Sequence, residues 1–115
     1  MADAAFDAIT AVLQHGAHPA DVVAAASVIE AAGFTTCDDL LHGYGGGYLP
    51  PVLGSASRPA GLVPDELFEA GMTVVIQPNV VSRDRRAGVQ TGELVLITAN
   101  GIEPLHRVRR GFLRV

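Results

Sequence analysis

The chain has 115 residues, with 12 acidic and 8 basic side chains, a formal net charge of −4 and 49% hydrophobic residues. This length suffices for one domain with a single core, and the hydrophobic content excludes a disordered chain. No stretch approaches the roughly 20 apolar residues that span a bilayer, and the acidic start Met1-Ala2-Asp3 lacks the basic segment of a signal peptide. We therefore expect a cytoplasmic protein with no membrane partner. A single cysteine, Cys37, excludes an intrachain disulfide and a zinc site built on cysteine pairs.

The charges are divided unevenly along the chain. Residues 1–57 contain acidic side chains and neither arginine nor lysine, whereas residues 58–115 contain all 8 basic residues, every one an arginine. The arginines alternate with acids such as Asp84, Glu93 and Glu103, so they form no uniform basic face. Nucleic acid is therefore not an expected partner.

The first 33 residues carry two helical patterns. Phe6, Ile9 and Leu13 recur at helical spacing after Asp3, which can cap the helix, and Gly16 stands where a helix commonly ends. A second pattern begins at Pro19, a favoured first helical residue, and ends at Gly33. The apolar stripe of this second pattern is Val22, Ala26 and Ile29. These patterns predict an αα-hairpin of two helices of about four turns each.

The middle of the chain shows no clear period. Residues 41–51 show no helical or strand period and are interpreted as a loop. Residues 54–64, rich in Gly, Ser, Ala and Pro, are interpreted as a surface connection, and residues 65–69 as at most one helical turn. The predicted strands then are Met72–Ile76, which Val80-Val81 can extend, Gly88–Thr98, Ile102–Leu105 and Gly111–Val115, with a turn at Asn100-Gly101. Two helices followed by antiparallel strands predict an α+β fold.

Four segments also match, in order and spacing, the motifs of one known family. His42-Gly43-Tyr44-Gly45 is similar to its His-Gly-x-Gly loop. Residues 69–78 resemble a strand that usually ends in Ile-Glu-Pro, residues 88–98 resemble its last ligand strand, and residues 100–105 resemble its closing turn and exit strand. The chain thus resembles the creatinase/aminopeptidase P/methionine aminopeptidase family, which has the pita-bread fold.

The resemblance implies a metallopeptidase ancestry. In the family, two Asp, one His and two Glu hold two divalent metals (Mn, Co or Zn), which activate water for amide hydrolysis. The fold has two related α+β halves, and residues 1–115 match only the second, C-terminal half. The strands with both Asp ligands are expected upstream of Met1. Asp38 and Asp39 do not match their positions.

Only three ligand positions can be carried over. The family histidine corresponds to His42, the first glutamate to Gln77 and the second to Gly92. Glu93 follows Gly92, but strand alternation turns it to the opposite face, so it could substitute only through a bulge. A second family histidine has no counterpart, because residues 48–51 are Tyr-Leu-Pro-Pro.

The resemblance implies an Xaa-Pro aminopeptidase- or dipeptidase-like hydrolase acting on peptides or small molecules. We predict that this chain alone is inactive as a peptidase and holds no metal, with His42 the only candidate ligand. One alternative is a metal-independent, creatinase-like enzyme in which His42 is the acid or base. Another is a non-catalytic binding module, with His42 ordering a turn. The expected partner is a second copy or a missing N-terminal half.

The remaining polar groups have simpler interpretations. Cys37 is interpreted as structural, and His15, His18 and His106 as surface residues. The two C-terminal arginine clusters, residues 83–86 and 107–110, are interpreted as solvated turns, with a clamp for a substrate carboxylate as the alternative. The glycines of residues 43–47 lack the features of a phosphate loop and are expected to allow close backbone packing.

Overall fold

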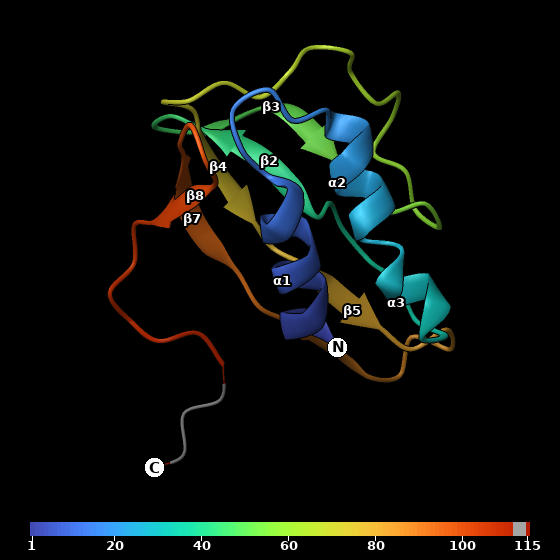
Figure 1. Cartoon of the computed structure of the whole chain (residues 1–115). Helices are drawn as coiled ribbons and strands as arrows, with labels where there is room; N and C mark the ends of the chain where they lie inside the picture. Colours follow the sequence, from blue (N-terminus) through green and yellow to red (C-terminus); the bar gives the residue numbers. More distant parts are fainter. Residues whose placement is uncertain (112–114) are drawn as a thin grey trace.

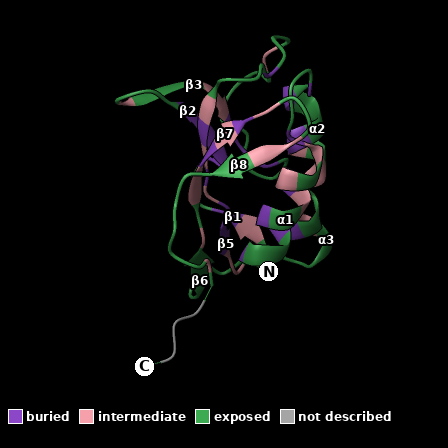
Figure 2. Ribbon diagram, turned by 60° about the vertical axis from the view of Figure 1, so that its left-hand side comes forward, coloured by how far each residue is buried: buried purple, intermediate pink, exposed green. Residues whose placement is uncertain are grey.

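The computed structural model describes residues 1–111 and 115, and it is an α+β domain (Figure 1). A five-stranded antiparallel sheet has the order β3-β2-β4-β7-β8, and a smaller sheet has the order β1-β5-β6. The helices lie on one side of the larger sheet (Figure 2). None of the helices in the described residues is long and apolar enough to cross a membrane.

The helical pair is confirmed, but the second helix is interrupted. Helix α1 spans Ala2–Val12, α2 spans Pro19–Ala25 and α3 spans Val28–Ala31. Between α2 and α3, the N–H of Ser27 donates to the oxygen of Ala24, a tighter turn than an α-helix makes. The helix end at Gly33 is confirmed, with φ of 84°. Helix α1 already ends at Val12, so Gly16, also with φ of 84°, lies in the turn that follows and the helix end predicted there is wrong. The N-cap of α1 is Met1 without a side-chain bond, so the predicted cap at Asp3 is wrong.

The predicted loop at residues 41–51 is wrong, because it forms a β-hairpin. Strand β2 is Leu41–Tyr44 and β3 is Tyr48–Leu53. The Gly and Pro residues hid the pattern: β3 is an edge strand, where proline is tolerated. Glycine is required at position 43, since a Cβ there would lie 2.3 Å from the backbone oxygen of Pro50.

The later strands confirm the predicted elements but divide them between two sheets. Strand β4 is Thr73–Ile76, β7 is Glu93–Ile97 and β8 is Ile102–Pro104. The chain bends after β4, so β5 (Asn79–Val81) does not extend it and instead pairs with β1 (Thr35–Thr36) and β6 (Gly88–Gln90). The predicted strand 88–98 is therefore split between β6 and β7. No helical turn forms at residues 65–69, and residues 112–114 of the predicted last strand lie outside the described residues.

The two faces of the larger sheet differ in what covers them. Val74 and Val95 pair across β4 and β7 and are buried together with Phe6 and Ile9 of α1 in the core cluster. On the opposite face lie residues of the other alternation, among them Val75, which is only partly buried. The helices therefore stabilise one face, and we call the other the open face.

Candidate functional site

The sheet register brings the three carried-over positions to the open face. His42 of β2 pairs with Val75 of β4, and Val75 pairs with Leu94 of β7. Gln77 follows Val75 by two residues and Gly92 precedes Leu94 by two, so both belong to the same alternation as His42. Positions 77 and 92 are also direct neighbours, because a Cβ on Gly92 would lie 3.4 Å from the Cβ of Gln77.

Gln77 is bound to a carboxylate that the sequence analysis set aside. Its Nε2 donates to Oδ2 of Asp39 over 3.1 Å, and Asp39 is only 5% exposed. A carboxylate only accepts hydrogen bonds, so this contact fixes which end of the Gln77 amide faces Asp39. The ion pairs among the described residues are all made by Arg110, which leaves Asp39 without a cationic partner.

Asn79, which is 2% exposed, positions the segments that carry Asp39 and Gln77. Its Oδ1 accepts the N–H groups of Cys37 and Asp38, both over 2.8 Å. Its Nδ2 donates to the backbone oxygens of Asp39 and Gln77, over 2.7 and 3.1 Å. One side chain therefore holds the approach to β2 against the end of β4.

His42 is held by the backbone of its own strand, β2. Its Nδ1 lies 2.8 Å from the backbone oxygen of Gly43, and the residue is 7% exposed. A carbonyl oxygen can only accept, so Nδ1 carries the proton and Nε2 is the acceptor in the neutral ring. The ring also stacks on Tyr48, with centroids 4.0 Å apart.

The Tyr48 hydroxyl connects this histidine with the acidic pair. Desolvation, hydrogen bonding to Asp39 and the negative charges of Asp39 and Asp38 raise the pKa of Tyr48 to about 12. Tyr48 therefore stays a neutral donor beside Asp39 at physiological pH. The stacked pair of His42 and Tyr48 therefore lies near the bonded pair of Asp39 and Gln77.

A hollow of about 600 Å³ opens on this face beside Gln77. Val75 and Leu94 are the apolar part of its lining, Tyr44 and His106 add two rings, and Gln77 and Gly92, which the resemblance aligns with the two family glutamates, also line it. His42 does not line this hollow, so the register places it on the same face without bringing it to the same cavity.

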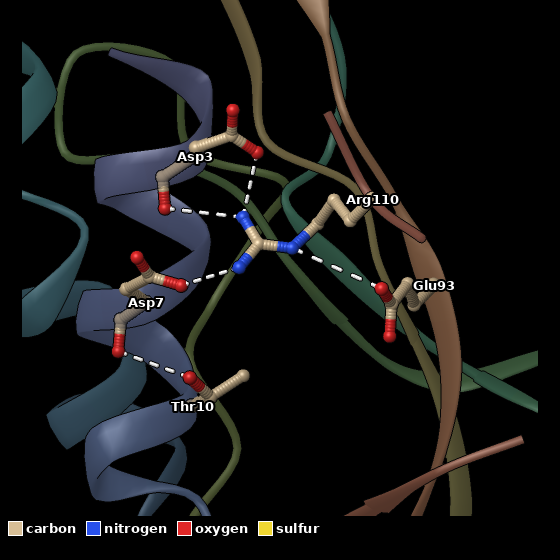
Figure 3. A network of polar contacts seen from close by, with 5 residues as sticks. All are labelled: Asp3, Asp7, Thr10, Glu93 and Arg110. Atoms are coloured by element: carbon tan, nitrogen blue, oxygen red, sulfur yellow. Dashed lines mark hydrogen bonds and ion pairs between the residues drawn. The ribbon is translucent and has the colours of Figure 1, made fainter. Parts of the chain in front are cut away.

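The carboxylate of Glu93 reaches Arg110 instead of position 92, as strand alternation predicted, although the residue also borders the hollow. It pairs with Ile76 across the sheet, and its Oε1 lies 3.8 Å from Nε of Arg110 (Figure 3). The same guanidinium binds Asp3 and Asp7 of α1, each over 2.6 Å, and lies over the ring of Phe6. The interpretation of Arg110 as a solvated turn residue is therefore wrong, and Glu93 cannot replace a ligand at position 92.

Comparisons with known proteins found no matching family model and no matching curated protein. Solved structures do match. An X-Pro aminopeptidase from Thermotoga maritima MSB8 superimposes with a TM-score of 0.77 at 17% identity over 96% of this chain. The dipeptidase PepE from Mycobacterium ulcerans gives 0.76 at 23% identity over 94%, and a methionine aminopeptidase from Rickettsia prowazekii gives 0.67 at 18% identity over 89%. The chain has the pita-bread fold. It spans 30%, 28% and 49% of the lengths of these three proteins.

The residues of this pita-bread chain do not suit a pair of divalent metals. In the part of the chain that the structure describes, no group of three His, Cys, Asp or Glu side chains is placed to hold a metal ion. Position 77 offers an amide that is already bonded to Asp39, and position 92 offers no side chain. Two bridged cations need several anionic oxygens, which this set does not supply.

Sequence reasoning found His42, Gln77 and Gly92 but missed Asp39, Asn79 and Tyr48. Asp39 was set aside because it matches no ligand position of the family. Asn79 lies between the predicted strand 72–76 and the residues 80–81 that can extend it, and it was given no role in the site. The available signal was the polar Gln-Pro-Asn run between two apolar strands, where a buried asparagine commonly bonds to the backbone.

Proposed function

We propose that this chain is a ligand-binding derivative of the metallopeptidase half that it resembles, which binds a small molecule or peptide at the open face and does not hydrolyse it. The observation that carries the proposal is the Gln77–Asp39 contact at one of the former ligand positions. An amide engaged by a neighbouring carboxylate neither neutralises a metal nor activates water. The hollow beside it is nevertheless kept, with an apolar lining and a few polar groups, as in binding sites generally.

The resemblance to Xaa-Pro aminopeptidases and dipeptidases selects the substrates for the test. Purified chain is incubated with Ala-Pro and Gly-Pro, with and without Mn, Co or Zn. We expect no release of the N-terminal residue above the blank. The neutral side chains at positions 77 and 92 cannot hold two cations at about 3.5–4 Å. Metal-dependent turnover that the chelator EDTA abolishes would overturn the proposal.

A second candidate, metal-independent acid–base catalysis by His42, is favoured by the proton position on its ring. The Nδ1 contact with the oxygen of Gly43 leaves Nε2 as a base, already oriented by the stack on Tyr48. Creatine, the substrate class that the family resemblance suggests for this candidate, is the probe. Activity without metal that His42→Asn abolishes would support it, and equal rates in both proteins would exclude it.

We further propose that the open face packs against another copy of this chain. In the described residues, helices cover only the opposite face, and Tyr44, Tyr48 and Leu49 are exposed on the β2–β3 hairpin. The matched solved proteins are two to four times longer than this chain, so their polypeptides have additional material that can cover such a face. A second copy of this chain would cover the open face instead, and the site would then lie between two chains.

A further inference from the structure

Asp39 is a buried carboxylate with no counter-charge. It is 5% exposed, and the ion pairs of the described residues all involve Arg110 and none involves Asp39. Its Oδ2 accepts a hydrogen bond from the neutral amide of Gln77 instead, and the neutral Tyr48 hydroxyl lies nearby. A carboxylate removed from water is costly unless a cation or hydrogen bonds compensate for it, and neutral donors compensate only in part. The surroundings of Asp39 therefore favour a positive charge.

The Gln77 amide transmits this preference to the hollow. Its nitrogen is committed to Asp39, and among the described residues its Oε1 accepts no hydrogen bond. Gln77 also lines the hollow, so the carbonyl oxygen is the acceptor that it can present to a ligand. The orientation of the Gln77 amide is fixed by chemistry, because the carboxylate of Asp39 can only accept a hydrogen bond and the amide nitrogen must therefore face it.

The rest of the lining suits a cation carried on an apolar body. Val75 and Leu94 provide apolar contact, and Tyr44, which is 40% exposed, offers a ring face to a positive charge. Arg110, which lines an adjoining hollow, is already neutralised by Asp3, Asp7 and Glu93. Its charge is therefore largely cancelled at this site.

We propose that the hollow binds a primary ammonium group, which donates to Oε1 of Gln77 and is attracted by the buried charge of Asp39. Asp39 is a positioning residue, because it acts through the orientation of Gln77 and through its field rather than by touching the ligand. The ammonium belongs to a small amine or to the N-terminus of a peptide. This inference rests on the proposed function, since it names the ligand class of the same hollow.

The test compares phenethylammonium with phenethyl alcohol, which has a similar shape and no charge. Binding to the full chain is followed by NMR titration at neutral pH. We expect the amine to bind at least about tenfold more tightly than the alcohol, since the charge meets a desolvated carboxylate nearby. Alanyl-proline amide and its N-acetylated form distinguish the peptide source, because only the free N-terminus carries the charge.

Two variants and a charge-matched control identify the groups responsible. Asp39→Asn removes the charge and frees the Gln77 amide to turn, so the preference for the amine over the alcohol should fall to less than about threefold. Asp38→Asn removes the same charge from the exposed neighbour and should keep the preference. Gln77→Met removes the acceptor at similar length, and it should also abolish the preference, which decides the matter if Asp39→Asn does not fold.

The outcomes separate the inference from the proposed function. Equal binding of amine and alcohol, equal effects of Asp39→Asn and Asp38→Asn, or no binding of the amine at millimolar concentration would overturn the ammonium site. Equal binding would leave the proposed function standing, because the hollow would still bind a ligand. The proposed function itself is overturned by hydrolysis in the separate assays, either metal-dependent peptidase activity or metal-free activity that His42→Asn abolishes.

Discussion

Replacing Asn79 by alanine should be among the most damaging single substitutions in this chain. The Asn79 side chain is 2% exposed and makes four hydrogen bonds, two as acceptor and two as donor. Asn79→Ala would leave the N–H groups of Cys37 and Asp38 and the oxygens of Asp39 and Gln77 without this partner. Each buried group left unpaired costs about 1 kcal/mol, and water that reaches some of these groups reduces the total. We therefore expect the free energy of unfolding to fall by about 2–4 kcal/mol. The total free energy of unfolding of a domain of this size is only about 5–15 kcal/mol.

The assay is urea denaturation of the full chain, followed by circular dichroism. The dependence of the unfolding free energy on urea concentration should have the same slope in variant and parent, so that a shift of the midpoint reports stability alone. Asn100→Ala is the matched control, because Asn100 is exposed and its side chain makes no hydrogen bond in the described residues. That control should change the unfolding free energy by less than about 0.5 kcal/mol. Amide exchange at Cys37 and Asp38 should accelerate only in Asn79→Ala. An Asn79→Ala protein as stable as Asn100→Ala would refute the positioning role of Asn79.

Three further predictions follow from other contacts. Gln77→Glu with Gly92→Glu should strengthen binding of Mn or Zn in calorimetry, because each substitution adds a hard anionic ligand. The steric cost arises at position 92, where the new Cβ would lie 3.1 Å from the oxygen of Ile76, and not from a left-handed backbone. Unchanged metal binding in a folded double variant would mean that positions 42, 77 and 92 do not converge. For Glu30, burial raises the pKa, but hydrogen bonds from the Ser57 hydroxyl and N–H outweigh it, so the pKa lies below its ordinary value of 4.5. The folding stability that the ionised Glu30 contributes is therefore present above pH 4.5 and lost as the pH falls through the lowered pKa. The difference in unfolding free energy between the parent and Glu30→Gln should close in an acid denaturation series, and a difference independent of pH would contradict this. Sedimentation at tens of micromolar should show self-association through the open face. A monodisperse monomer there, or an unchanged profile for Tyr44→Ser with Tyr48→Ser, would count against the second-copy proposal.

The helical half of the fold could be predicted because its signals are local. The apolar spacing of Phe6 and Ile9 and the proline at position 19 depend only on neighbours in sequence. Helix α2 begins at Pro19 as indicated, and α1 begins at Ala2, ahead of the predicted cap at Asp3. The interruption between α2 and α3 has no such signal, since Ala26 and Ser27 are compatible with a helix. The tight turn there buries both Ala26 and Ile29 completely, which is a requirement of packing rather than of local propensity.

The hairpin of β2 and β3 was missed because pairing, not alternation, defines it. Gly43 must be small because the backbone of Pro50 passes 2.3 Å from its would-be Cβ, and Pro50 is tolerated because β3 is an edge strand. Neither fact is readable from a composition rich in glycine and proline. The same limit applies to the site. The family motif led to position 77, but the partner of Gln77 is 38 residues away in sequence and matches no motif.

Asp39 and the identity of residue 77 depend on one another. A glutamate at position 77 would bring a second carboxylate to within about hydrogen-bond distance of Oδ2 of Asp39, and two like charges so close both resist ionisation unless a cation lies between them. Glutamine keeps the size and reverses the polarity at the atom that faces Asp39, so the pair becomes a hydrogen bond that needs no metal. Gly92 accommodates the close approach of the Ile76 oxygen, which would lie 3.1 Å from a Cβ at this position. Compared with the glutamates that the family resemblance implies at positions 77 and 92, Gln77 and Gly92 suit a face that presents a fixed amide rather than one that gathers cations around carboxylates.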